Sequence, residues 1–178
     1  QALSMSRNNI KIGVILQGAE TPFMKEVLKG IQEACAEVDN LGGTVLVHKI
    51  EHQNAEDVIL AMEKMRMEEV SGIAMVPLDE ERVKREIDRF VEEFRIPVVT
   101  FTSDVEDTKR LCFVGQNGVQ CGRAAAGLMG ELTGGKGKVA VISGYSTNTS
   151  LSSRVVGFRE EIARKYPGIE ILSLIHIS

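Results

Sequence analysis

IKIGVILQGAETPFMKEVLKGI, residues 10–31, decides how this chain is expected to fold. A short apolar run, residues 12–16, predicts a buried strand, and the polar residues after it, 17–21, predict a turn. Thr21 before Pro22 is a typical N-cap, so a helix is expected to begin there. Apolar side chains then share one face of that helix: Phe23, Val27, Leu28 and Ile31. Since α/β folds bind small molecules at the carboxyl ends of their strands, the turn is a candidate binding site.

The same alternation of strand and helix recurs along the chain. Further apolar runs predict strands at residues 44–47, 73–76, 96–101, 111–114, 138–142 and 169–171. Helices are expected between them, one capped by Asp79 and one over residues 118–132 with three residues facing inward, Ala125, Leu128 and Leu132. Apolar runs separated by one-faced helices are typical of parallel sheets covered on both faces. The predicted fold class is therefore α/β, with parallel sheets flanked by helices.

A polar segment, TSDVEDTKR at residues 102–110, interrupts the alternation. We interpret it as a crossing between two lobes of similar design, with residues 10–103 forming an N-terminal lobe and residues 104–171 the first part of a C-terminal lobe. Residues 1–9 are expected to form a hinge-like linker. Residues 172–178 read LSLIHIS, which resembles the translation of a transposase adapter used in sequencing libraries, so we interpret them as non-native read-through.

The composition argues against several function classes. The net charge is −4, so this chain lacks the basic footprint of a nucleic-acid-binding surface. No apolar run approaches the length of a membrane span, and no membrane partner is predicted. Three cysteines, Cys35, Cys112 and Cys121, match no metal or redox spacing, and neither a metal site nor a cofactor is predicted. Free thiols favour a reducing compartment.

Two motifs suggest enzyme chemistry, but each lacks an essential residue. Residues 130–136, GELTGGK, resemble a phosphate-binding loop, yet Gly137 stands where Ser or Thr would hold magnesium, and the segment joins a helix to a strand. Gly144-Tyr145-Ser146 resembles the turn around a nucleophilic serine, yet Asn148 stands where glycine is needed and no histidine is placed as base. We therefore assign no catalytic residue and do not predict an enzyme.

Polar side chains gather instead where the predicted strands end. In chain order they are Gln17, Glu20, Thr21, Asp79, Ser103, Asp104, Gln116, Asn117 and Asn148. Amide, hydroxyl and carboxylate groups of this kind suit a ligand rich in hydroxyl groups, and Phe23 suits the apolar face of a sugar ring. The alternative, that these residues are ordinary turn and cap residues, stays open for each of them.

Several segments together resemble one known family. IGVILQGAETPFMKEVLKGI, IPVVTFTSD, FVGQNGVQCGRAAAGLM, GKGKVAVISG and RVVGFREEI are similar, in this order, to the type I periplasmic-binding-protein fold. That family includes sugar-binding proteins of ABC transporters and ligand-sensing domains of LacI/GalR-type transcriptional regulators. The resemblance implies two α/β lobes with a ligand cleft between them, here with an incomplete C-terminal lobe. It implies ligand-facing roles for Gln17, Thr21, Phe23, Ser103 or Asp104, Asn117 and Arg154. Three positions depart from residues common in sugar-binding members: Val76, Thr102 and Ser152.

The first nine residues, QALSMSRNN, favour the regulator over the transporter component. They resemble the hinge helix that joins the DNA-binding domain of such a regulator to its sensor, and Leu3 matches the residue that wedges into the DNA minor groove. We therefore predict a cytoplasmic homodimer that binds a small-molecule effector, a carbohydrate, and binds DNA through a helix-turn-helix outside this chain. Ligand-induced closure of the cleft is expected to alter DNA binding. The alternative is the substrate-binding protein of a sugar ABC transporter, periplasmic or anchored as a lipoprotein.

Overall fold

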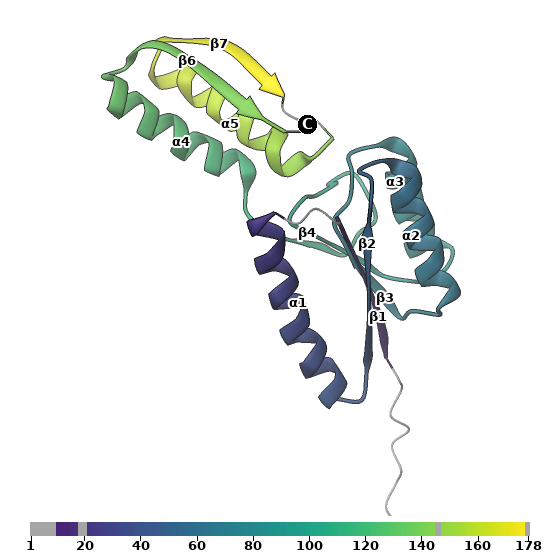
Figure 1. Cartoon of the computed structure of the whole chain (residues 1–178). Helices are drawn as coiled ribbons and strands as arrows, with labels where there is room; N and C mark the ends of the chain where they lie inside the picture. Colours follow the sequence, from purple (N-terminus) through teal and green to yellow (C-terminus); the bar gives the residue numbers. More distant parts are fainter. Residues whose placement is uncertain (1–9, 18–20, 145–146, 177–178) are drawn as a thin grey trace, which may run out of the picture.

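The computed structural model describes residues 10–17, 21–144 and 147–176. In chain order (Figure 1) the elements are β1 (Lys11–Gln17), α1 (Pro22–Asn40), β2 (Thr44–Ile50), α2 (Ala55–Met67), β3 (Gly72–Met75), α3 (Glu81–Glu92), β4 (Val98–Phe101), β5 (Cys112–Val114), α4 (Gly118–Thr133), β6 (Lys136–Ser143), α5 (Thr149–Lys165) and β7 (Gly168–His176). Each strand that an apolar run predicts is found, with ends that differ by a few residues.

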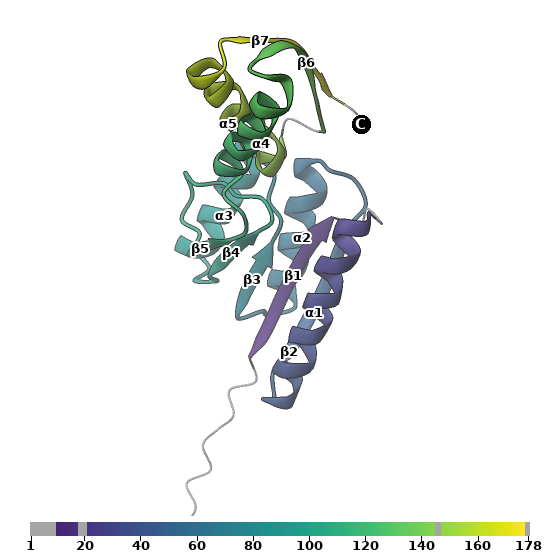
Figure 2. The same ribbon diagram turned by 90° about the vertical axis from the view of Figure 1, so that its left-hand side faces the viewer.

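The strands form two parallel sheets, which confirms the predicted fold class. Five strands pair in the order β2-β1-β3-β4-β5, and β6 pairs with β7. β1 is bonded on both sides, with Val14 opposite Val47 of β2 and Ala74 of β3. Because all these pairs are parallel, the strands of the larger sheet end at one common edge, and Figure 2 shows α4 and α5 beyond that edge.

Helices cover both faces of the larger sheet, which explains why its central strands β1, β3 and β4 are apolar on both sides. On one face, α2 and α3 bury a large apolar cluster that includes Ile15, Met75 and Phe90, all fully inaccessible. On the other face, α1 packs Met24 and Leu28 against a smaller cluster (Figure 1). Burying one such side chain contributes about 1.5–3 kcal/mol, so the cluster under α2 and α3 provides most of the stability of this sheet.

Side-chain caps fix where most of the helices begin. Four caps accept a backbone N–H bond in the first turn of α1, α2, α4 and α5: Thr21, Asn54, Asn117 and Asn148. The prediction that Asp79 caps the third helix is wrong, since α3 begins after Glu80, which makes no side-chain cap bond. The carboxylate of Asp79 instead lies 2.7 Å from Nζ of Lys84, so an ion pair with the first turn of α3 has replaced the cap.

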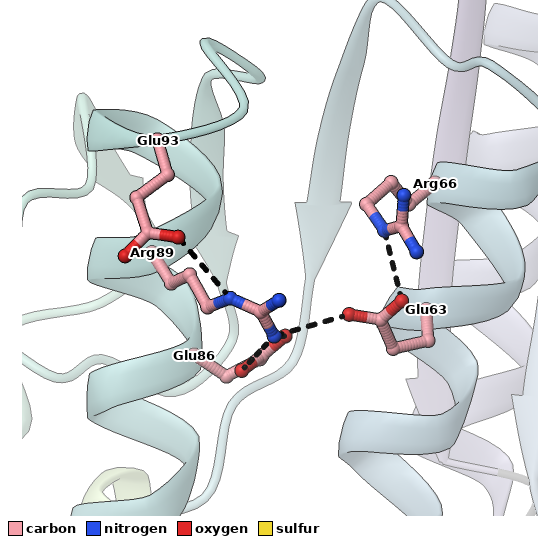
Figure 3. Close-up of polar contacts among 5 residues, drawn as sticks. All are labelled: Glu63, Arg66, Glu86, Arg89 and Glu93. Atoms are coloured by element: carbon pink, nitrogen blue, oxygen red, sulfur yellow. Dashed lines mark hydrogen bonds and ion pairs between the residues drawn. The ribbon is translucent and has the colours of Figure 1, made fainter.

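Charged side chains connect α2 and α3 on their solvent-facing side (Figure 3). Arg89 of α3 lies 3.5 Å from a carboxylate oxygen of Glu63 on α2 and 3.3 Å from one of Glu86 on its own helix. Arg66 binds the other oxygen of Glu63 at 2.8 Å. Burial and the neighbouring Glu63 raise the pKa of Glu86. Burial alone would raise the pKa of Glu63 too, but its bonds to Arg66 and the charge of Arg89 lower it. The cluster therefore links two helices electrostatically.

α4, α5, β6 and β7 form a C-terminal unit in which the two helices pack directly on each other. At Gly122 of α4 an added Cβ would lie 2.0 Å from the main-chain oxygen of Arg154 in α5, so this approach requires glycine. The inward face predicted for this helix is therefore wrong. Its buried residues are small, Gly122, Ala126 and Gly130, whereas the expected ones are exposed, namely Ala125, Leu128 and Leu132.

β7 is longer than the predicted strand at residues 169–171. It runs to His176, which pairs with Ser143 of β6, and the register shifts once between Val139 and Ala140. The strand therefore continues into the segment interpreted as read-through. The origin of residues 172–178 and the proposed lobe boundaries stay predictions.

Candidate functional site

The residues that follow β3 and β4 meet the start of α5 at the shared edge of the larger sheet. We call the residues that bridge the two units here the interunit contact: Asp79, Ser103, Asp104, Thr147, Asn148 and Thr149. The N–H of Asp79 donates to the main-chain oxygen of Thr147 at 3.0 Å. The hydroxyl of Ser103, which is 1% exposed, donates to Oδ1 of Asn148 at 2.8 Å. The structure thus brings together three of the predicted site residues, Ser103, Asp104 and Asn148.

Thr149 is the central residue of the interunit contact, and sequence reasoning missed it. Its Oγ1 accepts from the N–H of Asp104 at 2.9 Å and donates to the main-chain oxygen of the same residue at 2.7 Å. One hydroxyl therefore uses both its donor and its acceptor capacity on one residue 45 positions away. A threonine directly after the N-cap Asn148 carries no local signal of such a partner.

The carboxylate of Asp104 is already occupied within the protein. Nε and Nη2 of Arg110 bind its two oxygens, and the hydroxyl of the fully buried Thr100 donates to Oδ1 at 2.7 Å. Burial alone would raise the pKa of Asp104, but the hydrogen bonds from Arg110 and Thr100 outweigh it and hold that pKa below its usual range. Asp104 thus anchors the segment between β4 and β5, and Arg110, which sequence reasoning did not select, is its main partner.

The predicted residues Asn117 and Arg154 lie on the C-terminal unit. Oδ1 of Asn117 accepts from the N–H of Gln120 at 3.0 Å, which is its role as the cap of α4. Arg154 donates through Nη1 to the main-chain oxygen of Ser150 at 3.1 Å and through Nη2 to Oε1 of Gln116 at 3.0 Å. Arg154 therefore ties α5 to the residues that precede α4.

The turn after β1 contributes the other predicted residues. Gln17 is 8% exposed and its Oε1 accepts from Nε2 of Gln53 at 2.8 Å. Thr21 caps α1 by accepting from the N–H of Met24 at 3.1 Å. Phe23 is 62% exposed, so it does not pack on the sheet with Leu28 as the helical pattern predicted. Glu20 and the proposed hinge residue Leu3 lie outside the described residues.

A cavity of about 640 Å³ opens beside the interunit contact. Its walls are residues 102–107, the segment before and at the start of α4, and the first turns of α5. The cavity joins the predicted residues Ser103, Asp104 and Asn117, but Gln17, Phe23 and Arg154 are not among the residues that line it. A volume of this size suits a small ligand, and hydroxyl and amide groups dominate the polar part of its wall.

Two features of the cavity wall set its electrostatics and geometry. Nζ of Lys84 lies 2.7 Å from Asp79 and 3.1 Å from Asp107, and these hydrogen bonds raise the pKa of Lys84. Its charge is therefore neutralised within the wall. Thr102 adopts a φ of 61°, which is unusual for a β-branched residue, and strain of this kind is concentrated at functional sites.

The described residues show neither a metal-binding group nor a membrane-spanning element. Within residues 10–17, 21–144 and 147–176, no three His, Cys, Asp or Glu side chains are grouped so that they could hold a metal ion. Among the helices the structure describes, none is long and apolar enough to cross a membrane.

Comparison with known proteins identifies the family. The family model described as periplasmic binding protein domain matches residues 12–177. This chain therefore belongs to the periplasmic binding protein domain family, and its fold is of the type I periplasmic-binding-protein kind. No curated protein matches the chain.

Solved structures of two functional classes share the fold. An ABC transporter solute-binding protein from Burkholderia graminis, in complex with D-arabinose, is 27% identical with a TM-score of 0.85 over 94% of this chain and 56% of its own. GanP, a glucose-galactose binding protein from Geobacillus stearothermophilus, is 25% identical, with a TM-score of 0.82 over 94% and 58%. A putative LacI transcriptional regulator from Bacteroides fragilis is 21% identical, with a TM-score of 0.84 over 94% and 60%. The chain thus spans less than two thirds of each of these structures.

Proposed function

We propose that this chain is a sugar-binding domain that closes on its ligand through movement of its two units. The supporting observation is the arrangement at the shared sheet edge, where amide and hydroxyl side chains of both units meet beside a cavity of about 640 Å³. Groups of this kind can both donate to and accept from sugar hydroxyls. The D-arabinose complex of the 27% identical solute-binding protein supports a carbohydrate as ligand.

The test is a thermal-shift screen of the full-length protein. The sugars are D-arabinose, D-glucose, D-galactose and other monosaccharides. A ligand that binds only the folded state at a hundred times its Kd stabilises it by about 2.7 kcal/mol, so a binding sugar must raise the melting temperature measurably. Unchanged melting with every sugar at millimolar concentration would refute a sugar-binding function. Isothermal titration calorimetry then gives the affinity for any sugar that does shift the melting temperature.

We further propose that the domain is the sensor of a LacI/GalR-type regulator, with cleft closure changing how a dimer binds DNA. The feature that favours this is residues 1–9, QALSMSRNN, with Leu3 as the minor-groove residue. Three free cysteines agree with a cytoplasmic protein. The competing function is a transporter substrate-binding protein, and it has the support of the 27% identical D-arabinose complex, whereas the putative LacI regulator is 21% identical and supports the fold alone.

The coding sequence upstream of Gln1 separates these two functions. A helix-turn-helix of about fifty residues would support the regulator, and sugar-dependent retardation of promoter DNA by the purified protein would then demonstrate it. A signal peptide or a lipidation cysteine would instead establish the transporter component. The sugar-binding proposal stands or falls separately, by the thermal-shift screen.

A further inference from the structure

Two glutamine amides are buried together at the carboxyl ends of β1 and β2. Gln17 is the last residue of β1, and Gln53 lies in the connection that follows β2. Nε2 of Gln53 donates to Oε1 of Gln17 at 2.8 Å. The other two amide atoms, Nε2 of Gln17 and Oε1 of Gln53, are both inaccessible to solvent and have no hydrogen-bond partner in the described structure. One buried donor and one buried acceptor therefore remain unsatisfied.

Native proteins leave few buried polar atoms unpaired, and each one that remains requires an explanation. The pair could close on itself with two bonds, yet only one is made. Turning both amides exchanges donor and acceptor but still leaves one of each unsatisfied. The site is therefore complementary to a group that accepts one hydrogen bond and donates another, and it carries no charge of its own. A hydroxyl group has this combination, whereas a carboxylate, a phosphate or an ammonium group does not.

The pair lies outside the wall of the cavity described above, but on the same carboxyl edge of the larger sheet. Gln17 immediately precedes the turn between β1 and α1, and β1 pairs with both β2 and β3 at the edge that faces the C-terminal unit. Gln53 is only half-buried, so the pair lies close to the protein surface. The sequence motifs singled out Gln17 but not Gln53.

We propose that Gln53 is a ligand-binding residue that acts with Gln17 to bind one hydroxyl group of a sugar. The hydroxyl accepts from one amide and donates to the other, completing a three-membered hydrogen-bonded ring. The inference rests on the proposed sugar-binding function and adds to it a specificity element. Sugars that lack the hydroxyl at this position leave the amides unpaired and bind more weakly, because hydrogen-bonding sites reject ligands that lack the matching group.

The test compares the wild-type protein with Gln53→Met, which keeps side-chain length and removes the carbonyl and NH2 of the Gln53 amide. Titration calorimetry uses D-arabinose, D-glucose or D-galactose, whichever binds, together with each of its monodeoxy analogues. We expect Gln53→Met to bind the parent sugar about tenfold more weakly. One monodeoxy analogue must bind wild type and variant equally, because it lacks the hydroxyl that the pair recognises. Gln32→Met, at an exposed position of α1, is the control and must bind like wild type.

Three results would overturn the inference. Wild-type affinity of Gln53→Met for every sugar would mean that Gln53 does not contact the ligand. Equal weakening for the parent sugar and all its monodeoxy analogues would mean a purely structural role. No binding of any sugar by the wild type would refute the proposed function and this inference together. If Gln53→Met does not fold, Gln17→Met/Gln53→Met removes both amides, leaves no orphaned atom and serves in the same titrations.

Discussion

Asp104→Asn tests whether the carboxylate of Asp104 anchors the segment between β4 and β5. The substitution keeps the shape but removes the charge, so the Arg110 guanidinium loses its partner in a site where the two side chains are only 17% and 12% exposed. Breaking a buried pair by removing one partner typically costs about 3–5 kcal/mol, and the residual exposure places this pair at the lower end, about 3 kcal/mol. With a urea slope of about 2 kcal/mol/M, the unfolding midpoint falls by about 1.5 M at pH 7.

The acid dependence of the same variant checks the cause. The folded-state pKa of Asp104 is lowered, so its contribution to stability is present above the unfolded pKa of about 3.9 and is lost as the pH falls through the folded value. The difference between wild type and Asp104→Asn should therefore shrink below about pH 4. Glu92→Gln breaks the well-exposed pair with Lys109 and is the matched control, with an expected loss under about 0.5 kcal/mol.

A double-mutant cycle with Arg110→Met isolates the interaction between the two side chains. The coupling energy should exceed about 1 kcal/mol, since each single variant leaves one charge unpaired and the double variant leaves none. A loss below about 1 kcal/mol in Asp104→Asn, or additive effects in the cycle, would refute the anchoring role.

Three further predictions concern packing and charge. Gly157→Ala should lower the free energy of unfolding, measured in urea, by about 2 kcal/mol, because the new Cβ would lie 2.0 Å from a main-chain oxygen of α4. The control Gly127→Ala has open space around it and should be neutral or slightly stabilising. Equal effects of the two substitutions would contradict the close contact between α4 and α5. Phe90→Ala should cost about 3–5 kcal/mol at a fully buried site, and a loss under about 1 kcal/mol would contradict the assigned core. Arg89→Met should lower the melting temperature more at pH 7 than at pH 4.5. The pKa of Glu86 is raised, so acid protonates Glu86 and relieves its repulsion with Glu63 of α2. A loss that does not depend on pH would contradict the proposed role of Arg89 between these carboxylates.

The sequence predicts the fold well because burial on both faces of a parallel sheet leaves a local record. Ile15 and Met75 lie in continuous apolar runs, and each run becomes a strand. Hydrophobic patterning fails for α4, where it predicts that Leu128 and Leu132 face the interior although both are exposed. Helix–helix contact there requires small residues such as Gly122, and a hydrophobicity pattern gives glycine no weight.

The candidate site is only partly predictable, because its contacts join residues far apart in the chain. Polar residues at strand ends can be read from the sequence, and Ser103, Asp104 and Asn148 were selected in this way. Their partners could not be, since Thr149 lies 45 residues from Asp104 and no local pattern relates the two. The ligand-binding roles of the selected residues stay predictions. Thr21, Asn117 and Asn148 also cap helices, and a side chain that caps a helix can bind a ligand through its remaining hydrogen-bonding groups.

The interunit contact depends largely on atoms that every residue possesses. Asp79 contributes its N–H, Thr147 its carbonyl oxygen, and Asp104 both of these groups to Thr149. Substitution of the side chains at positions 79 and 147 by any residue except proline therefore leaves these bonds chemically available. The exceptions are the hydroxyl of Thr149 and the bond between the side chains of Ser103 and Asn148. A designer who wishes to change ligand preference can vary the surrounding side chains and still retain the alignment of the two units, provided that Ser103, Asn148 and a hydroxyl at position 149 are kept.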